Sequence, residues 1–175
     1  MRVFLASIPL DGRAIAVVGG GDMALAKLRL ALTTPARVLW FDPARGGGAP
    51  APPGAPEPLR RLPTSADLDG VALTFIALDE AQQAGNAAAA ARAAGALVNF
   101  VDRPELSDFH TPALVDRGDV VVGIATGGAA PVLARDVRSR IEAALPKGLA
   151  ILGAASRDIR STVMATFADF DARRR

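Results

Sequence analysis

The spacing of hydrophobic residues divides the first part of the chain into alternating strands and helices. Short apolar runs predict buried strands, because a strand covered on both faces carries few polar residues. These runs lie at 14–18, 37–41, 71–77 and 96–101. Apolar residues recur at helical spacing over 22–33, and an alanine-rich segment predicts a second helix over 79–94. The order of strand, helix and strand predicts a βαβ unit and hence a parallel sheet.

Residues 43–58 interrupt this alternation. The segment is rich in proline, which lacks an N–H donor, and in glycine, which loses much backbone entropy on folding. A helix is therefore excluded here, and we expect a loop. A short edge strand is expected directly after it, at 59–62.

Beyond the last of these strands the pattern predicts a hairpin and two helices. Strand-like runs at 113–115 and 120–125 flank the sequence Asp-Arg-Gly-Asp, which contains a turn signal. Proline is tolerated in the first turn of a helix, so Pro131 is expected to open a helix over 131–145. A last amphipathic helix is expected over 149–170.

Composition narrows the classes of protein that this chain can be. Of the 175 residues, 50% are hydrophobic and 22% are charged, which supports a packed core and excludes a disordered chain. The absence of cysteine excludes disulfides and thiolate chemistry. His110 is the single histidine and is expected to be structural, and no set of His, Asp and Glu has the spacing of a metal site.

Charge and hydropathy also limit the partners. The formal net charge is +2, and the one basic run lies at 173–175, so no nucleic-acid partner is expected. No apolar stretch reaches the ~18 residues that a membrane span needs, and the N-terminal apolar run is too short for a signal peptide. We therefore expect a cytoplasmic protein without a membrane partner.

A glycine-rich turn after the first strand carries the candidate cofactor chemistry. The run Gly19-Gly20-Gly21-Asp22-Met23-Ala24 fits the pattern G-x-G-x-x-G/A between a strand and a helix, which is typical of a Rossmann-type dinucleotide site. The glycines allow a tight turn and let a pyrophosphate approach the start of the helix, and Ala24 permits close packing of helix and strand. We expect all six residues to bind the cofactor.

Asp42, at the end of the second strand, indicates which dinucleotide is bound. An acid at this position accepts hydrogen bonds from the ribose hydroxyls and repels a 2′-phosphate, so the sequence favours NAD over NADP. Arg45 weakens this preference, because an arginine there can meet a 2′-phosphate. The structural alternative is a plain turn at the glycines, with Asp42 as a cap of its strand.

Two further groups are candidates for binding and converting a substrate. Asp102 follows the fourth strand, whose carboxyl end faces the same crevice as the glycine turn, and its carboxylate can remove a proton while a hydride leaves to the nicotinamide. Thr126, Gly127 and Gly128 form a second glycine turn, whose N–H groups suit a carboxylate-rich substrate. Arg135 on the following helix can also meet carboxylates. The structural alternatives are a capping acid before Pro104 and a plain strand-to-helix connection.

Three blocks of this sequence resemble the precorrin-2 dehydrogenase module of the siroheme synthase family. They are the glycine turn followed by Lys27, then Asn99-Phe100-Val101-Asp102, then Thr126-Gly127-Gly128-Ala129-Ala130-Pro131-Val132-Leu133-Ala134-Arg135. The third block is the most specific, and the similarity covers most of the chain. With this resemblance we also count Pro43, Ala77 and Leu78 among the expected cofactor contacts.

The resemblance implies NAD-dependent oxidation of precorrin-2 to sirohydrochlorin. In some members the same site also inserts ferrous iron, as a sirohydrochlorin ferrochelatase. The family's key aspartate corresponds to Asp102, and the resemblance assigns it to the dehydrogenation and, in bifunctional members, to chelation. Family members are homodimers built through the segment after the sheet. We therefore expect a Rossmann NAD-binding domain at 1–112, a dimerisation segment at 113–145, and a shortened C-terminal helical segment at 146–175.

Departures from the family pattern leave other interpretations open. The loop at 43–58 replaces a helix, Leu78 replaces a threonine, and the region that helps to cover the tetrapyrrole is short. The alternatives are a non-catalytic module that binds NAD or a tetrapyrrole, and a protein that only chelates metal. The expected fold class is α/β, with a Rossmann-type parallel sheet, a small hairpin-plus-helix segment and a short C-terminal helix.

Overall fold

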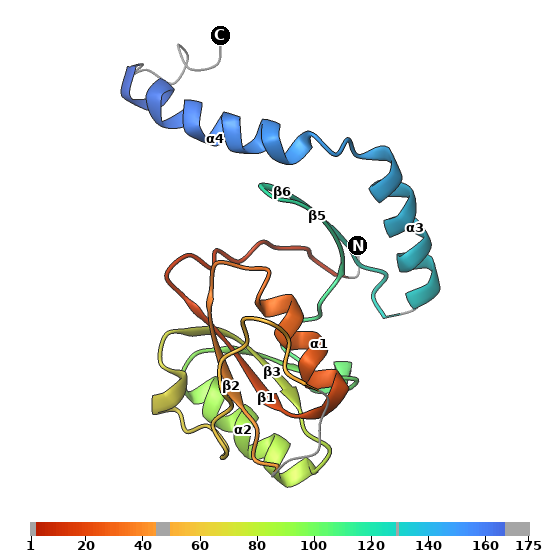
Figure 1. The fold of residues 1–175 in the computed structure, drawn as a ribbon. Helices are drawn as coiled ribbons and strands as arrows, with labels where there is room; N and C mark the ends of the chain where they lie inside the picture. Colours follow the sequence, from red (N-terminus) through yellow and green to blue (C-terminus); the bar gives the residue numbers. More distant parts are fainter. Residues whose placement is uncertain (1–2, 45–49, 129, 167–175) are drawn as a thin grey trace. The chain divides into compact units, whose positions relative to one another are not determined.

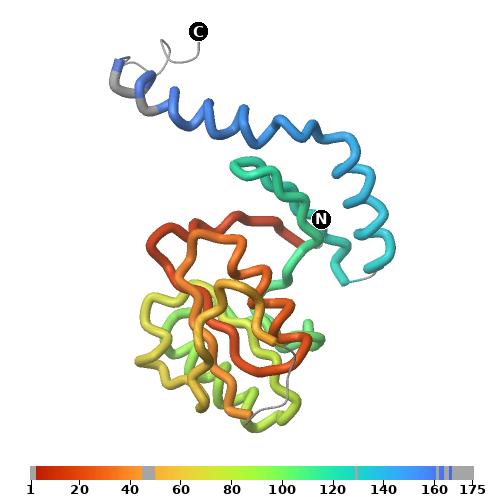
Figure 2. The backbone as a smooth tube through the Cα atoms, viewed as in Figure 1, coloured from red at the N-terminus to blue at the C-terminus, as the bar shows by residue number. Residues whose placement is uncertain are grey.

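The computed structural model describes residues 3–44, 50–128 and 130–166, and Figures 1 and 2 trace the path of the chain. The chain divides into two compact units, one formed by Ser7–His110 and the other by Met1–Ala6 with Thr111–Arg175. Arg45, Ala129 and the basic run at 173–175 lie outside the described residues. Among the helices that are described, none is long and apolar enough to cross a membrane.

The unit Ser7–His110 contains the predicted parallel sheet. Its strands are β1 (Ala14–Gly19), β2 (Arg37–Phe41), β3 (Val71–Ala77) and β4 (Leu97–Phe100), in the order β2-β1-β3-β4. All three neighbouring pairs are parallel. Helix α1 (Gly21–Ala31) joins β1 to β2, and α2 (Ala81–Ala93) joins β3 to β4 (Figure 1). The predicted βαβ arrangement is confirmed.

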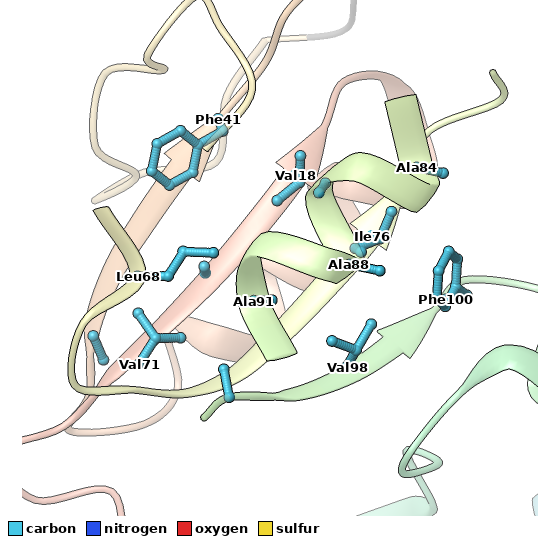
Figure 3. Close-up of a cluster of buried hydrophobic side chains, with 14 residues drawn as sticks. Val18, Phe41, Leu68, Val71, Ile76, Ala84, Ala88, Ala91, Val98 and Phe100 are labelled. Atoms are coloured by element: carbon cyan, nitrogen blue, oxygen red, sulfur yellow. The ribbon is translucent and has the colours of Figure 1, made fainter. Parts of the chain in front are cut away.

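The central strand β1 is buried on both faces, as its unbroken apolar run predicts. Side chains alternate across a strand, so Ile15 and Val17 pack in a cluster with α1, whereas Ala16 and Val18 pack in a second cluster with α2. Figure 3 shows this second cluster between α2 and the sheet. The helix contributes Ala84, Ala87, Ala88 and Ala91, whose small side chains let its backbone lie close to the strands.

The predicted edge strand at 59–62 is wrong. Only an isolated parallel bridge forms there, between Leu59 and Phe41. The Leu59 N–H donates to the Trp40 carbonyl at 2.9 Å, and the Leu59 carbonyl accepts from the Asp42 N–H at 2.9 Å. Prolines precede and follow this short run, and proline has no N–H with which to extend a ladder. The described parts of the preceding 43–58 segment contain no helix or strand, as expected.

The second unit contains the predicted hairpin and helices. Strands β5 (Ala113–Arg117) and β6 (Val120–Ile124) pair antiparallel in a sheet of their own. Helix α3 (Pro131–Ala144) begins at its proline, and α4 (Leu149–Thr166) follows. The predicted end of the last helix, at residue 170, lies outside the described residues.

Candidate functional site

The strand order places a crevice at the carboxyl ends of β1 and β3. Within the sheet, β2 is the neighbour of β1 on one side and β3 is its neighbour on the other. In open parallel sheets, ligands bind where the strand order reverses in this way. Gly19 and Ala77 end the two strands and are paired in register, so both lie at this end of the sheet.

Gly19 is required by the close approach of β1 and β3. A Cβ atom on Gly19 would lie 2.0 Å from the Ala77 carbonyl oxygen, and the residue has a φ of 128°. The Gly19 carbonyl accepts a hydrogen bond of 2.9 Å from the indole Nε1 of Trp40, a buried side chain of β2. Neighbouring strands on both sides therefore fix the start of the glycine turn.

Gly20 and Gly21 leave the start of α1 open. A Cβ on Gly20 would lie 3.0 Å from the Asp42 carboxylate, so the absence of a side chain lets Asp42 sit directly against the turn. Gly21 has a φ of 71° and open space where a Cβ would project. The first N–H groups of a helix have no partner within the helix and attract phosphate. This open cradle at a helix start fits the pyrophosphate of a dinucleotide.

A pocket of about 640 Å³ lies beside this turn. That volume is in the range of small-molecule sites. Six of the predicted cofactor contacts line it: Gly20, Gly21, Asp42, Pro43, Ala77 and Leu78. The other four predicted contacts, Gly19, Asp22, Met23 and Ala24, are not among its lining residues. Ala24 is fully buried against the sheet, which agrees with the packing role expected of it, whereas Asp22 and Met23 are exposed on the first turn of α1.

Sequence reasoning missed two important residues of the pocket, Trp40 and Arg60. The Arg60 guanidinium donates from Nη1 to Asp42 Oδ2 at 2.7 Å, in an ion pair. The other carboxylate oxygen of Asp42 accepts from the Ala44 N–H at 3.2 Å. Arg60 carries no sequence signal, because its position depends on the single bridge at Leu59. The acids Asp79 and Glu80 also line the pocket, and their place directly after β3 could have indicated this.

Asp102 occupies a turn directly after β4. The Val101 N–H still donates to the Ile76 carbonyl at 2.9 Å, and Asp102 then turns away with a φ of 61°. Among the described residues other than glycine, it is the one with a positive φ. Such a conformation is tolerated by aspartate and asparagine and is enriched at functional sites. The Asp102 side chain is exposed and is not part of the pocket lining.

Lys27 on α1 lies within electrostatic reach of Asp102. Its Nζ atom stands 5.2 Å from the centroid of the Phe75 ring, and the residue is half-buried. Burial lowers the pKa of Lys27 below its usual value, and the negative charge of Asp102 partly opposes this shift. The sequence identified Lys27 only as part of a motif, and its proximity to Asp102 is a property of the fold.

The predicted substrate contacts belong to the other unit. Gly127 and Gly128 have φ values of 63° and 81°, so the second glycine turn needs residues without a side chain. Thr126 is half-buried, and Arg135 is exposed on α3. Within the described part of the chain, no group of three or more His, Asp and Glu side chains is placed to hold a metal ion. His110 Nε2 lies 3.2 Å from the Pro104 carbonyl oxygen.

Comparison with known proteins agrees with this geometry. The family described as "Putative NAD(P)-binding" matches residues 6–113. The siroheme synthase of Chromobacterium violaceum is 38% identical over all of this chain and 38% of its own length. That of Stutzerimonas stutzeri is also 38% identical, over 94% of this chain and 36% of its own length. The chain thus spans less than two-fifths of the length of these relatives.

A solved structure shares the fold. The chain superposes on the precorrin-2 dehydrogenase SirC with a TM-score of 0.78, covering 98% of this chain and 86% of that one. The sequence identity of this pair is 18%. The likeness confirms the predicted fold class, an α/β parallel sheet of four strands followed by a hairpin and two helices.

Proposed function

The chain belongs to the "Putative NAD(P)-binding" family, as a relative of the N-terminal NAD-binding module of siroheme synthases, and on this premise we propose that it oxidises precorrin-2 to sirohydrochlorin with NAD. The observation that carries the proposal is the open helix start at Gly21 beside the Asp42 carboxylate, within a pocket of about 640 Å³. Bound NAD supplies the acceptor for a hydride from the substrate.

The residues of the pocket bind and orient the dinucleotide. The N–H groups at the start of α1 receive the pyrophosphate, because the helix dipole and the glycine turn favour an anion there. Asp42 accepts hydrogen bonds from the adenosine ribose, since a carboxylate can accept about four hydrogen bonds and two are described for it. Ala77 and Leu78 at the end of β3 line the same pocket.

Asp102 takes up the proton that the reaction releases. Oxidation of precorrin-2 removes a hydride and a proton, and the exposed carboxylate of Asp102 accepts the proton. The left-handed backbone at Asp102 supports this role, because strained conformations cluster at active sites. We propose that the turn Thr126–Gly128 and Arg135 bind the carboxylate groups of the tetrapyrrole, through backbone N–H groups and a guanidinium.

We further propose that the second unit forms a homodimer. Large apolar side chains are exposed on this unit, and α3 has no buried residue among those described. We propose that these side chains form the contact between the two copies, because a contiguous exposed apolar surface marks an interaction site. The residues concerned are Val121, Val132, Leu133, Ile151, Leu152 and Ile159. Sedimentation equilibrium should give twice the mass of the chain, and a monomer at micromolar concentration would overturn this part of the proposal.

Anaerobic incubation with precorrin-2 and NAD tests the activity. We expect sirohydrochlorin and NADH to appear in equal amounts. Asp102→Asn should lower the rate about a hundredfold or more, because it removes a proton acceptor, yet it should leave NAD binding intact. Asparagine is a better replacement than alanine, since asparagine tolerates a φ of 61° as aspartate does. NAD binding without turnover in the wild type would favour the non-catalytic module instead.

The wild type and Asp102→Asn also serve to test the ferrochelatase activity, with sirohydrochlorin and ferrous iron as substrates. Metal insertion releases protons from the tetrapyrrole, so a carboxylate base at Asp102 would serve this reaction too. If Asp102→Asn lowers both rates, one carboxylate serves both reactions. Oxidation without any insertion of iron would restrict the protein to the dehydrogenase step.

A further inference from the structure

We propose that Arg60 reads the 2′ position of the adenosine ribose and lets the pocket accept NADP as well as NAD. The inference rests on the dinucleotide binding of the proposed function and does not depend on its chemistry. It concerns a residue that the sequence did not single out, and it changes the preference for NAD that Asp42 alone predicts.

The backbone holds Arg60 beside Asp42. The Leu59 N–H donates to Trp40, and the Leu59 carbonyl accepts from the Asp42 N–H, so the bridge at Leu59 fixes the start of the Arg60 side chain next to the end of β2. From there Arg60 Nη1 donates to Asp42 Oδ2 at 2.7 Å and to the Ala44 carbonyl at 3.2 Å. The guanidinium is thus held beside the carboxylate to which the proposed function assigns the ribose.

This ion pair offsets the repulsion that a strand-end acid exerts on a 2′-phosphate. An isolated carboxylate excludes NADP through its negative charge. Here the charge of Asp42 is balanced by a guanidinium at hydrogen-bond distance. The pocket therefore presents an acceptor for a 2′-hydroxyl and a cation for a 2′-phosphate at the same place.

The exposure of the two partners favours contact between Arg60 and a ligand. The Asp42 side chain is 12% exposed, whereas that of Arg60 is 52% exposed. Both hydrogen bonds described for Arg60 use Nη1. A guanidinium has five N–H donors in a fork that matches phosphate, so it can keep its bond to Asp42 and bind a phosphate with its remaining groups.

The other charged residues described in the pocket are acids, which makes Arg60 important for binding a 2′-phosphate. The described lining residues include four acids, Asp42, Glu57, Asp79 and Glu80, and Arg60 is the one cation among them. A 2′-phosphate that enters this pocket adds charge to an acidic surface. Among the described lining residues, Arg60 is the one whose charge attracts this phosphate, so Arg60 should contribute more to the affinity of NADP than to that of NAD. An experiment can detect this difference.

Calorimetric titration of the whole chain with NAD and with NADP tests the inference. The wild type should bind both, with dissociation constants within about tenfold of each other. Arg60→Met should weaken NADP by about tenfold or more, the value of one charge-assisted hydrogen bond, and change NAD by less than about threefold. Adenosine 2′,5′-bisphosphate should lose affinity in parallel with NADP, and AMP should not.

Arg61→Met is the matched control. Arg61 is the next residue and also forms an ion pair, but with Asp67, and it does not line the pocket. This variant should leave the ratio of NAD to NADP affinity unchanged. The inference is overturned if the wild type binds NAD alone, or if Arg60→Met weakens both dinucleotides equally. If neither binds, the proposed function falls as well, whereas binding of both without oxidation of precorrin-2 overturns only the proposed activity.

Discussion

Gly19 and Ala77 meet at the ends of β1 and β3 with no room for a side chain between them. A Cβ on Gly19 would lie 2.0 Å from the Ala77 carbonyl oxygen and 2.7 Å from its carbonyl carbon. The two residues are paired in register, so a displacement at this point would separate the strands where the pocket begins. Glycine is thus needed here for packing of the sheet, and the phosphate cradle lies one and two residues further on.

Gly19→Ala should therefore act on stability. Overpacking against a backbone carbonyl and a φ of 128° together predict a loss of about 2–4 kcal/mol in the free energy of unfolding. Urea denaturation followed by circular dichroism measures this loss. Gly85→Ala on α2, where a Cβ meets open space, is the control and should be neutral or stabilising. A loss below about 1 kcal/mol for Gly19→Ala would mean that the strands part easily.

Gly21 and Gly12 form a matched pair that separates cofactor binding from backbone strain. Their φ values are 71° and 70°, and a Cβ on either would meet no protein atom within 4 Å. Alanine at each position should therefore cost a similar amount of stability, about 1 kcal/mol. Only Gly21 lines the pocket, so Gly21→Ala should weaken NAD binding about tenfold or more while Gly12→Ala should not. Equal NAD affinities in the two variants would place the pyrophosphate elsewhere.

Much of the fold was predictable, because each strand, helix and turn is marked by a pattern of residues that are consecutive in the sequence. The unbroken apolar run of β1 predicts burial on both faces, and the two clusters on either side of the sheet confirm it. The proximity of the glycine turn and Asp42 could also be predicted, because they follow the ends of two consecutive parallel strands. The pocket brings Gly20, Gly21 and Asp42 together as this spacing predicts.

What the sequence could not reveal depends on contacts between distant residues. Arg60 reaches Asp42 from 18 positions further along the chain, through one bridge at Leu59. The hydrogen bond from Trp40 to Gly19 and the charge interaction of Lys27 with Asp102 likewise join different elements. Periodicity describes which face of an element is buried, but it carries no information on which polar groups then meet.

Asp108 should make stability depend on pH. Arg92 donates to its carboxylate at 2.8 Å and the Val98 N–H donates at 2.9 Å, and these bonds hold the pKa of Asp108 below its usual value of 3.8. The ionised form therefore stabilises the fold above that value, and this contribution is lost as the pH falls through the lowered folded-state pKa. Asp108→Asn should cost about 1 kcal/mol at neutral pH, since Arg92 is partly exposed.

Unfolding by urea at several pH values measures this effect. The difference in unfolding free energy between wild type and Asp108→Asn should be constant near neutral pH and shrink below about pH 4. A difference that persists unchanged in acid would assign the stabilisation to the shape of the side chain instead of its charge.

Asp102→Asn should change the titration of Lys27. Burial lowers the pKa of Lys27, and the negative charge of Asp102 raises it part of the way back. The neutral amide removes this opposing effect, so the ammonium should lose its proton at lower pH in the variant than in the wild type. The chain has two lysines, Lys27 and Lys147, which makes the side-chain NMR signals simple to assign. The Lys147 signal should be unchanged between the two proteins. Identical Lys27 titrations in both would show that the carboxylate of Asp102 does not act on this lysine, whether or not the protein turns over precorrin-2.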